Sequence, residues 1–357
     1  MDALIKRILD AVPDYRINAG FSLTEEKITE WIMQFNKSDR DFVLDEMGNI
    51  FEKRYLSEDT AKDSMEEIIK ALKKDLGYSS EVDLLLNSYF LDLQEDGKSQ
   101  KILLGFFDEF IQTKYGIKLK DCGKTSRTNL IYLDDILCTG NTVYWDLVKW
   151  LSLKDGKGIS TFDKVYKRNS KIILIYFIEH KLNSDVLRRK FWYFNHYLPD
   201  MVKQYYFDDY LVNNDYREAN ASLNFAFPLK EFLSKKAREY GNGIHEDVNE
   251  LCTRKGFDIR GRFCREENTP KKEILFSNND NRNRFENILI DTGLKILNSV
   301  NNIRKKNIRP LGYDLPTYKS FGFGTLSFTW RNIPNTSPIV FWYKTRDWNP
   351  LFEKRGN

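Results

Sequence analysis

Long hydrophobic runs are missing from this sequence. The longest apolar run in its middle, Ile172–Ile178, is far shorter than the roughly 20 residues that a membrane-spanning helix needs. The segment Met1–Asp10 lacks the basic-then-apolar order of a secretory signal, and Asp2 and Asp10 contradict that interpretation. We therefore expect a protein without a membrane partner.

Cysteine and proline are also scarce. The four cysteines form no Cys-x-x-Cys pair, which favours free thiols in a reducing, cytoplasmic setting over zinc ligands or disulfides. Only 9 of the 357 residues are proline whereas 14% are aromatic, so that wholesale disorder is excluded. The formal net charge of +4 is small for this length, and it permits nucleic acid as a partner without requiring it.

The first eighty residues have the apolar spacing of helices. The sequence Ser-Leu-Thr-Glu at residues 22–25 is typical of a helix start, because its first and last side chains satisfy free backbone amides. A later helix is expected over Ser57–Leu76, and Gly77 ends it. We therefore predict a helical N-terminal subdomain over residues 1–80.

From residue 81 the pattern changes to alternating strands and helices. Strands are expected over Asn87–Leu93, Asn129–Leu133 and Lys171–Glu179, with helices over Gln100–Tyr115 and from about Thr142. The third run is almost wholly apolar, as in strands that are buried on both faces of a parallel sheet. This order predicts an α/β core over residues 81–190.

The remaining residues, 191–357, are interpreted as a C-terminal α+β extension that completes or caps the site. A helix is expected over Arg284–Ile303, and strands over Thr325–Trp330 and Ile339–Tyr343. Residues 332–335 between the two strands have the composition of a turn.

One segment of the core carries more chemistry than the rest. The apolar run Leu130–Leu133 leads to two adjacent carboxylates, Asp134 and Asp135, and a short turn at Cys138–Thr142 opens a helix. Open α/β sheets bind ligands at this end of their strands. Free amides at a helix start, with Gly140 allowing close approach, suit a phosphate. Because carboxylates suit sugar hydroxyls or Mg²⁺, the segment predicts a site for a phosphorylated sugar.

The same segment resembles the signature of type I phosphoribosyltransferases, which bind phosphoribosyl pyrophosphate. That signature is an apolar strand, two acids, three residues and Thr-Gly-x-Thr, and every defining position matches. The resemblance implies a phosphoribosyltransferase-like parallel sheet in which Asp134 and Asp135 are the catalytic acids, face the ribose 2′ and 3′ hydroxyls and take part in binding Mg²⁺. The loop that it implies for the 5′-phosphate consists of Cys138, Thr139, Gly140, Asn141 and Thr142.

A second, weaker match concerns the pyrophosphate group. The family's pyrophosphate loop follows the first strand and opens a helix, and Gly97, Lys98 and Ser99 stand in that place. Some purine-salvage members carry an acid at the first position of the phosphate loop. That position is Cys138 here, so that no general base is assigned and the acceptor stays open.

Four further polar residues are candidates for the same site. Glu179 and His180 end the third strand, where plain solvent exposure explains them equally well. Asn332 and Asn335 in the tail are the other two, and turn geometry is their alternative explanation.

The tail is similar to the C-terminal end of the phosphoribosyltransferase-like effectors of bacterial anti-phage systems, including retron-associated ones. The segments that carry this similarity are Phe-Gly-Phe-Gly-Thr at 321–325, Arg-Asn-Ile-Pro-Asn at 331–335 and Trp-Asn-Pro-Leu-Phe at 348–352. The resemblance implies an antiviral defence toxin that transfers a phosphoribosyl group or cleaves a nucleotide at ribose C1. It also implies a winged-helix or other defence protein, or a nucleoprotein complex, as partner.

Two interpretations of other classes stay open. The same cradle can sense phosphoribosyl pyrophosphate or a nucleotide without catalysis. A nucleic-acid-directed effector is the other, and its best support is the basic cluster of residues 304–306 with Arg309, which a solvated helix end also explains.

Overall fold

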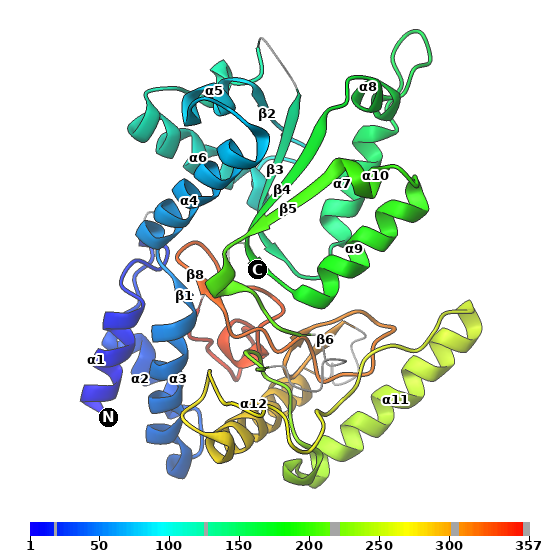
Figure 1. Ribbon diagram of the computed structural model, residues 1–357. Coiled ribbons are helices and arrows are strands. Elements are labelled where there is room, and N and C mark those ends of the chain that lie inside the picture. The colour runs from blue at the N-terminus through cyan, green and yellow to red at the C-terminus, as the bar shows by residue number, and fades with distance from the viewer. Residues whose placement is uncertain (18–19, 125–127, 215–221, 301–306, 353–357) are drawn as a thin grey trace. The chain divides into compact units, whose positions relative to one another are not determined.

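The chain divides into two compact units. Figure 1 shows the computed structural model, which describes residues 1–17, 20–124, 128–214, 222–300 and 307–352. Residues 59–211 form the first unit, here called the sheet unit, and residues 1–58 with 212–357 form the second, here called the helical unit. The helical unit thus groups the front helices with the tail, and the division into three parts at residues 80 and 190 stays a prediction.

A four-stranded parallel sheet is the centre of the sheet unit. Its strands lie side by side in sequence order, and Asp134, Tyr176 and Tyr206 are in register across three of them. This confirms the predicted α/β class. The apolar composition of the second and third strands explains their burial, because helices cover both faces. The strands are β2 (Ser88–Phe90), β3 (Asn129–Leu137), β4 (Lys171–Glu179) and β5 (Val202–Tyr206).

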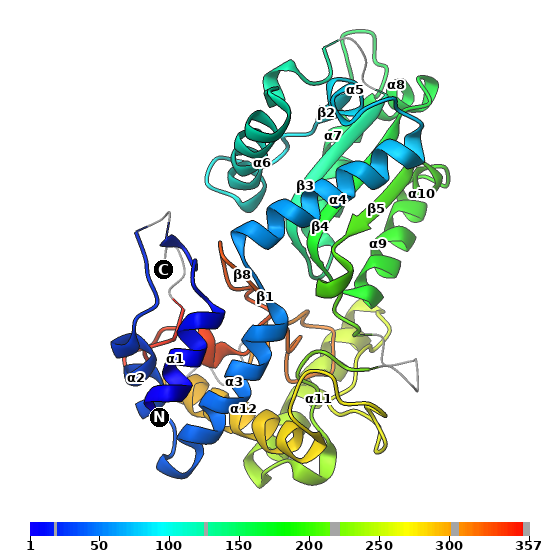
Figure 2. The same cartoon turned by 60° about the vertical axis from the view of Figure 1, so that its left-hand side comes forward.

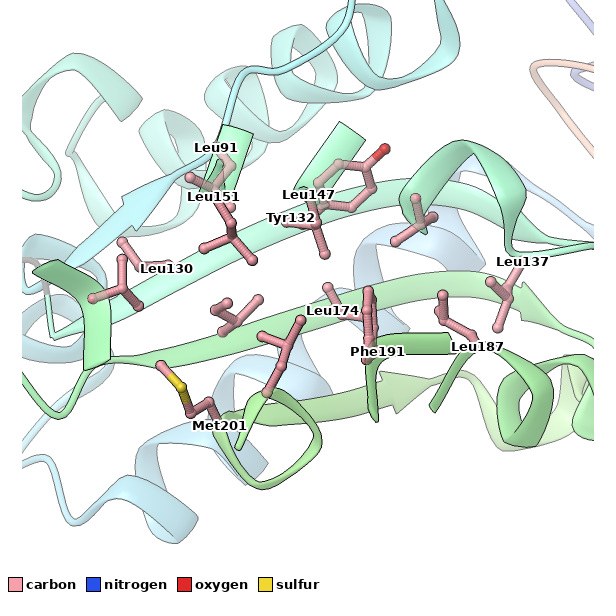
Figure 3. Close-up of a cluster of buried hydrophobic side chains, with 14 of the residues drawn as sticks. Leu91, Leu130, Tyr132, Leu137, Leu147, Leu151, Leu174, Leu187, Phe191 and Met201 are labelled. Carbon is pink, nitrogen blue, oxygen red and sulfur yellow. The ribbon is translucent and has the colours of Figure 1, made fainter. Parts of the chain in front are cut away.

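Helices cover the two faces of this sheet. Helices α7 to α10 pack on one face through a cluster that includes Tyr132, Leu147, Leu174 and Phe191 (Figure 3). Helix α4 crosses the other face, as Figure 2 shows, and its Asp75 accepts a hydrogen bond of 2.8 Å from Tyr205 on β5. The helices are α4 (Glu58–Leu76), α5 (Glu81–Leu86), α6 (Ser99–Tyr115), α7 (Asn141–Leu151), α8 (Thr161–Lys167), α9 (Lys181–Phe194) and α10 (Leu198–Met201).

The helical unit brings together the two ends of the described chain. The indole Nε1 of Trp31 and that of Trp348 both donate to the carbonyl oxygen of Val340, each at 3.0 Å. The ring of Phe35 packs against both indoles, so that the front helices share one aromatic core with the tail. The elements are α1 (Asp2–Ala11), α2 (Glu25–Met33), α3 (Arg40–Arg54), β1 (Tyr55–Leu56), α11 (Lys235–Lys255), α12 (Asn279–Ser299), β6 (Ile308–Arg309), β7 (Gly312–Tyr313) and β8 (Phe328–Thr329).

A buried network of charges ties α12 to the loops before it. Glu286 accepts from Arg265 at 2.5 Å and from Arg282 at 3.1 Å, and all three side chains are shielded from water. Glu273 binds Arg282 from the other side at 2.5 Å. The charges are paired and hydrogen-bonded, as burial requires.

Several elements of the tail differ from those that the sequence predicts. The predicted strand over Thr325–Trp330 is reduced to β8, which pairs in parallel with β1. The predicted strand over Ile339–Tyr343 is a 3₁₀ turn at Ile339–Phe341. The side chains of that turn are fully buried, and an apolar run that short does not distinguish a strand from another buried element. The predicted helix over Arg284–Ile303 is α12, which begins earlier and ends at Ser299. In the basic cluster, residues 304–306 lie outside the described residues, and Arg309 is buried against Asp314.

The structure also bears on hydrophobic helices and on the cysteines. Among the described residues, no helix combines the length and apolarity that a bilayer crossing demands. All four cysteines are free thiols.

Candidate functional site

The acid pair lies at the carboxyl end of β3. Asp134 is 5% exposed and Asp135 is 9% exposed, so that both carboxyls are largely removed from water. Asp134 Oδ1 accepts a hydrogen bond of 2.9 Å from the hydroxyl of Ser99 and another of 2.9 Å from the backbone amide of Asp135. The first contact joins the start of α6 to the acid pair, although 35 residues separate them in the sequence.

Burial sets the electrostatics of this pair. It raises the pKa of Asp134 well above the ordinary value, the neighbouring charge of Asp135 raises the pKa further, and the hydrogen bond from Ser99 opposes both effects. Two carboxyls in this setting are under-solvated. A ligand that donates hydroxyl hydrogens, or a cation, would therefore find two largely buried carboxyl groups as acceptors.

The predicted phosphate loop links β3 to α7. Gly140 immediately precedes α7 and has a φ of +66°, a left-handed conformation that favours glycine. A Cβ atom there would lie 3.2 Å from the Cβ atom of Leu187, so that α9 packs tightly against the turn. The hydroxyl oxygen of Thr139 accepts a hydrogen bond of 3.3 Å from the backbone amide of Asn141. The exposed Thr142 lies in the first turn of α7. The loop thus combines a helix start with hydroxyl groups, which suits an anion.

Sequence reasoning did not identify one cation beside this loop. Lys190 on α9 donates from Nζ to Asn141 Oδ1 at 2.5 Å and lies 5.9 Å from the ring centroid of Tyr144. It places a positive charge against the loop. Its position 49 residues downstream hides it from a motif search. The packing of Leu187, one turn before Lys190 on α9, against Gly140 brings this cation to the loop, and that contact is not visible in the sequence.

The segment predicted to hold pyrophosphate lies at the start of α6. Gly97 has a φ of +82°, Lys98 is exposed, and Ser99 makes the contact with Asp134 described above. The buried Gln100 holds the preceding turn, because its Oε1 accepts the amides of Leu93 at 2.9 Å and Gln94 at 3.1 Å. Lys98 therefore directly precedes the residue that contacts Asp134, at the start of α6.

Glu179 and His180 lie at the end of β4, next to the start of the phosphate loop. The amide of His180 donates to the carbonyl oxygen of Leu137 at 3.1 Å. Burial raises the pKa of Glu179 to about 7; the Ser184 hydroxyl opposes the rise, and Asp185 adds to it. Both side chains are buried, and the alternative of plain solvent exposure does not hold for them.

The hydroxyl of Tyr176 belongs to the same end of the sheet. Burial raises its pKa well above the ordinary value, and the charges of Asp134 and Glu179 act in the same direction. Within the described residues, neither this hydroxyl nor Glu179 Oε2 has a hydrogen-bond partner. Buried polar atoms without partners are costly, which is typical of sites that a ligand completes.

The two asparagines of the tail belong to the helical unit, not to the sheet unit. Both side chains are exposed, and their backbones take part in turns: the amide of Asn332 donates to the carbonyl oxygen of Thr329, and the amide of Tyr313 donates to that of Asn335. Their predicted role at the site stays a prediction.

The acid pair and the loop at the start of α7 lie at the carboxyl end of a parallel sheet, which is the arrangement that the resemblance to a phosphoribosyltransferase-like α/β protein implies. A comparison with protein families gives the same class. The family model described as PRTase-CE matches residues 28–354, and the chain belongs to that family. No curated protein and no solved structure matched the chain.

Proposed function

We propose that the sheet unit binds a phosphoribosyl group at Asp134, Asp135 and the loop 138–142. The observation that carries this proposal is the hydrogen bond from Ser99 to Asp134, because it joins the two segments that pyrophosphate and ribose would need. Membership of the PRTase-CE family supports a transferase. Phosphate would take the amides at the start of α7, ribose hydroxyls the acid pair, and pyrophosphate Lys98.

A Mg²⁺ ion fits this site only in part. The acid pair offers carboxylate oxygens, which Mg²⁺ prefers, yet the described residues contain no cluster of three or more His, Cys, Asp or Glu side chains that could hold a metal alone. The ion would therefore take its remaining ligands from pyrophosphate and water. Asp134 and Asp135 are the residues that would hold it.

The chemistry supported by this arrangement is substitution at C1 of the ribose. In a transfer reaction, an acceptor forms a bond to C1 while the C1–O bond to pyrophosphate breaks and pyrophosphate leaves with the electron pair. In cleavage of a nucleotide, water forms a bond to C1 while the C1–N bond breaks and the base leaves with the electron pair. The proton that water loses ends on the base or in solvent. The buried carboxylates would stabilise positive charge that develops on the ribose.

The test is titration calorimetry with phosphoribosyl pyrophosphate and Mg²⁺. We expect the wild type to bind phosphoribosyl pyrophosphate and the double variant Asp134→Asn, Asp135→Asn to bind it at least about 100-fold more weakly. The reason is that the two carboxylates that would accept hydrogen bonds from the ribose hydroxyls lose their charge. The matched control is Asp208→Asn, Asp209→Asn, which neutralises an exposed Asp-Asp pair in the same unit. Equal binding by both double variants would refute the site.

A sensor without catalysis is the second candidate function. The specific observation in its favour is that a half-buried thiol, Cys138, opens the phosphate loop where some purine-salvage relatives carry an acid. Pyrophosphate or base release, measured with a range of acceptors, separates the two: ligand binding without any turnover would favour the sensor.

The proposed cellular role is that of an effector in bacterial anti-phage defence. The similarity of residues 321–325, 331–335 and 348–352 to such effectors supports it. Phage plating on bacteria that express the full system, with and without the acid-pair variant, is the measurement. Unchanged protection by the variant would contradict a role of this site in defence.

A further inference from the structure

Exposed aromatic side chains gather on one segment of the sheet unit. Every exposed tryptophan and tyrosine of the described residues lies between residues 141 and 200, with exposed fractions from 47% to 79%. Elsewhere in the described ranges, tryptophans and tyrosines are buried or half-buried. Large rings left in water at several neighbouring positions indicate a surface that binds something. The five residues are Trp145, Tyr166, Trp192, Tyr193 and Tyr197.

Helix α9 interleaves these rings with cations. Its exposed side includes Arg188 and Arg189, and Trp192 and Tyr193 follow each of them by four residues. Residues four apart are neighbours on a helix surface, so that each guanidinium group is within reach of one of the rings. The centroids of the Trp192 and Tyr193 rings are 5.2 Å apart at 78°, which presents two ring faces in different directions.

Helix α7 extends the same surface toward the phosphate loop. Trp145 and Lys149 are exposed one turn apart on α7, and the ring of Tyr144 lies 6.1 Å from that of Phe191 on α9. The two helices lie on the same face of the sheet (Figure 1). The surface therefore spans two packed helices.

Charge separates this segment from the rest of its unit. Residues 141–200 contain eleven Lys and Arg against six Asp and Glu. Residues 59–140 and 201–211 contain twelve basic and seventeen acidic residues. The basic surplus of the unit thus lies in the same chain segment as its exposed aromatic rings, which favours a polyanion that also carries flat apolar groups.

We propose that this aromatic–basic strip, made of Trp145, Lys149, Arg188, Arg189, Trp192 and Tyr193, binds single-stranded nucleic acid. Phosphates would pair with the cations, and unpaired bases would stack on the rings, which is how sequence-tolerant single-strand binding works. Lys149, Arg188 and Arg189 lie on the same two helices as the rings and give the strip a positive charge, which a polyanion would neutralise. The proposal goes beyond the phosphoribosyl site, because none of these residues belongs to the acid pair or the loop.

The probe is a fluorescently labelled 20-nucleotide oligothymidylate, with oligouridylate and a 20-base-pair duplex beside it, followed by anisotropy at several salt concentrations. We expect Trp192→Ala, Tyr193→Ala to weaken single-strand binding by about 5-fold to 150-fold for each base that loses its stacking partner. Arg188→Gln, Arg189→Gln is expected to reduce the log–log salt slope by about 1.4, since each phosphate contact to a single strand contributes about 0.7. The matched control is Lys255→Ala, Phe257→Ala, which removes an exposed cation and ring from the helical unit.

Four results would overturn the proposal. They are absence of single-strand binding at low salt, unchanged binding by both strip variants, equal loss in the control, and duplex binding as tight as single-strand binding. Because the altered side chains are exposed, the variants are expected to fold, and thermal melting checks this. If oligonucleotides do not bind but sedimentation shows a dimer that Trp192→Ala, Tyr193→Ala dissociates, the strip is an interface between copies of the chain instead.

Discussion

The buried carboxyl of Glu179 leads to a quantitative prediction of how the unfolding free energy depends on pH. It is 4% exposed at the end of β4, and burial raises its pKa from 4.5 to about 7. The raised value means that the folded protein binds the proton more tightly than the unfolded chain. The resulting stabilisation is fully present below pH about 4.5 and is lost as the pH rises through about 7. At about 1.4 kcal/mol per unit, the whole effect is about 3 kcal/mol.

Replacing Glu179 by glutamine removes this titration while keeping size and hydrogen-bonding capacity. Between pH 5 and pH 8 we expect the wild type to lose about 2–3 kcal/mol of unfolding free energy relative to Glu179→Gln. The assay is urea unfolding followed by circular dichroism at pH 5, 6, 7 and 8. The matched control, Glu95→Gln, removes an exposed carboxylate from the same unit, and water solvates that charge in both states.

The reasoning fails if the wild type and Glu179→Gln have parallel pH profiles. It also fails if the glutamine variant is the less stable protein at pH 8, because an ionised Glu179 would then be stabilising. If Glu95→Gln reduces the loss of unfolding free energy between pH 5 and pH 8 as much as Glu179→Gln does, the general charge of the unit causes that loss instead.

Two further changes test packing around the site and in the helical unit. Gly97→Ala places a side chain at a φ of +82° with nothing within 4 Å, and it is expected to cost about 1–2 kcal/mol of unfolding free energy. Gly140→Ala places its side chain at a φ of +66° and 3.2 Å from Leu187, and it is expected to cost more. Equal shifts in Tm would contradict the packing of α9 on the loop. Glu286→Ala leaves Arg265 and Arg282 without their shared carboxylate and is expected to cost about 3–5 kcal/mol of unfolding free energy. The control Glu266→Ala is expected to cost less than about 1 kcal/mol, because its ion pair with Arg262 is exposed. A loss for Glu286→Ala as small as that of the control would show that water reaches the arginines.

Much of the sheet unit could be predicted because its signals are local. The apolar run Lys171–Glu179 is β4 with the same bounds, and α6 ends at the predicted residue, Tyr115, where Gly116 follows in a left-handed conformation. The edge strand β5 escaped prediction, because its sequence Val-Lys-Gln-Tyr-Tyr is half-buried and mixed in polarity. Edge strands lack the continuous apolar run that identifies a central strand.

The candidate site divides in the same way. Asp134, Asp135 and the loop that follows them are contiguous, so that one motif contains them. Lys190 reaches the loop only through the packing of α9, and the hydrogen bond from Ser99 depends on how α6 meets β3. Contacts of this kind are set by tertiary structure, which spacing along one sequence does not reveal.

The order of synthesis gives the two units different histories. Residues 59–211 are continuous in the chain, so that the sheet unit can fold as soon as it leaves the ribosome. The helical unit has to wait, because Trp31 and Phe35 pack on side chains from residues 341 and 348. During that interval its aromatic side chains are exposed to chaperones and to neighbouring chains. Chains that stop before residue 340 should therefore carry a folded sheet unit and an unfinished helical unit that is prone to aggregate.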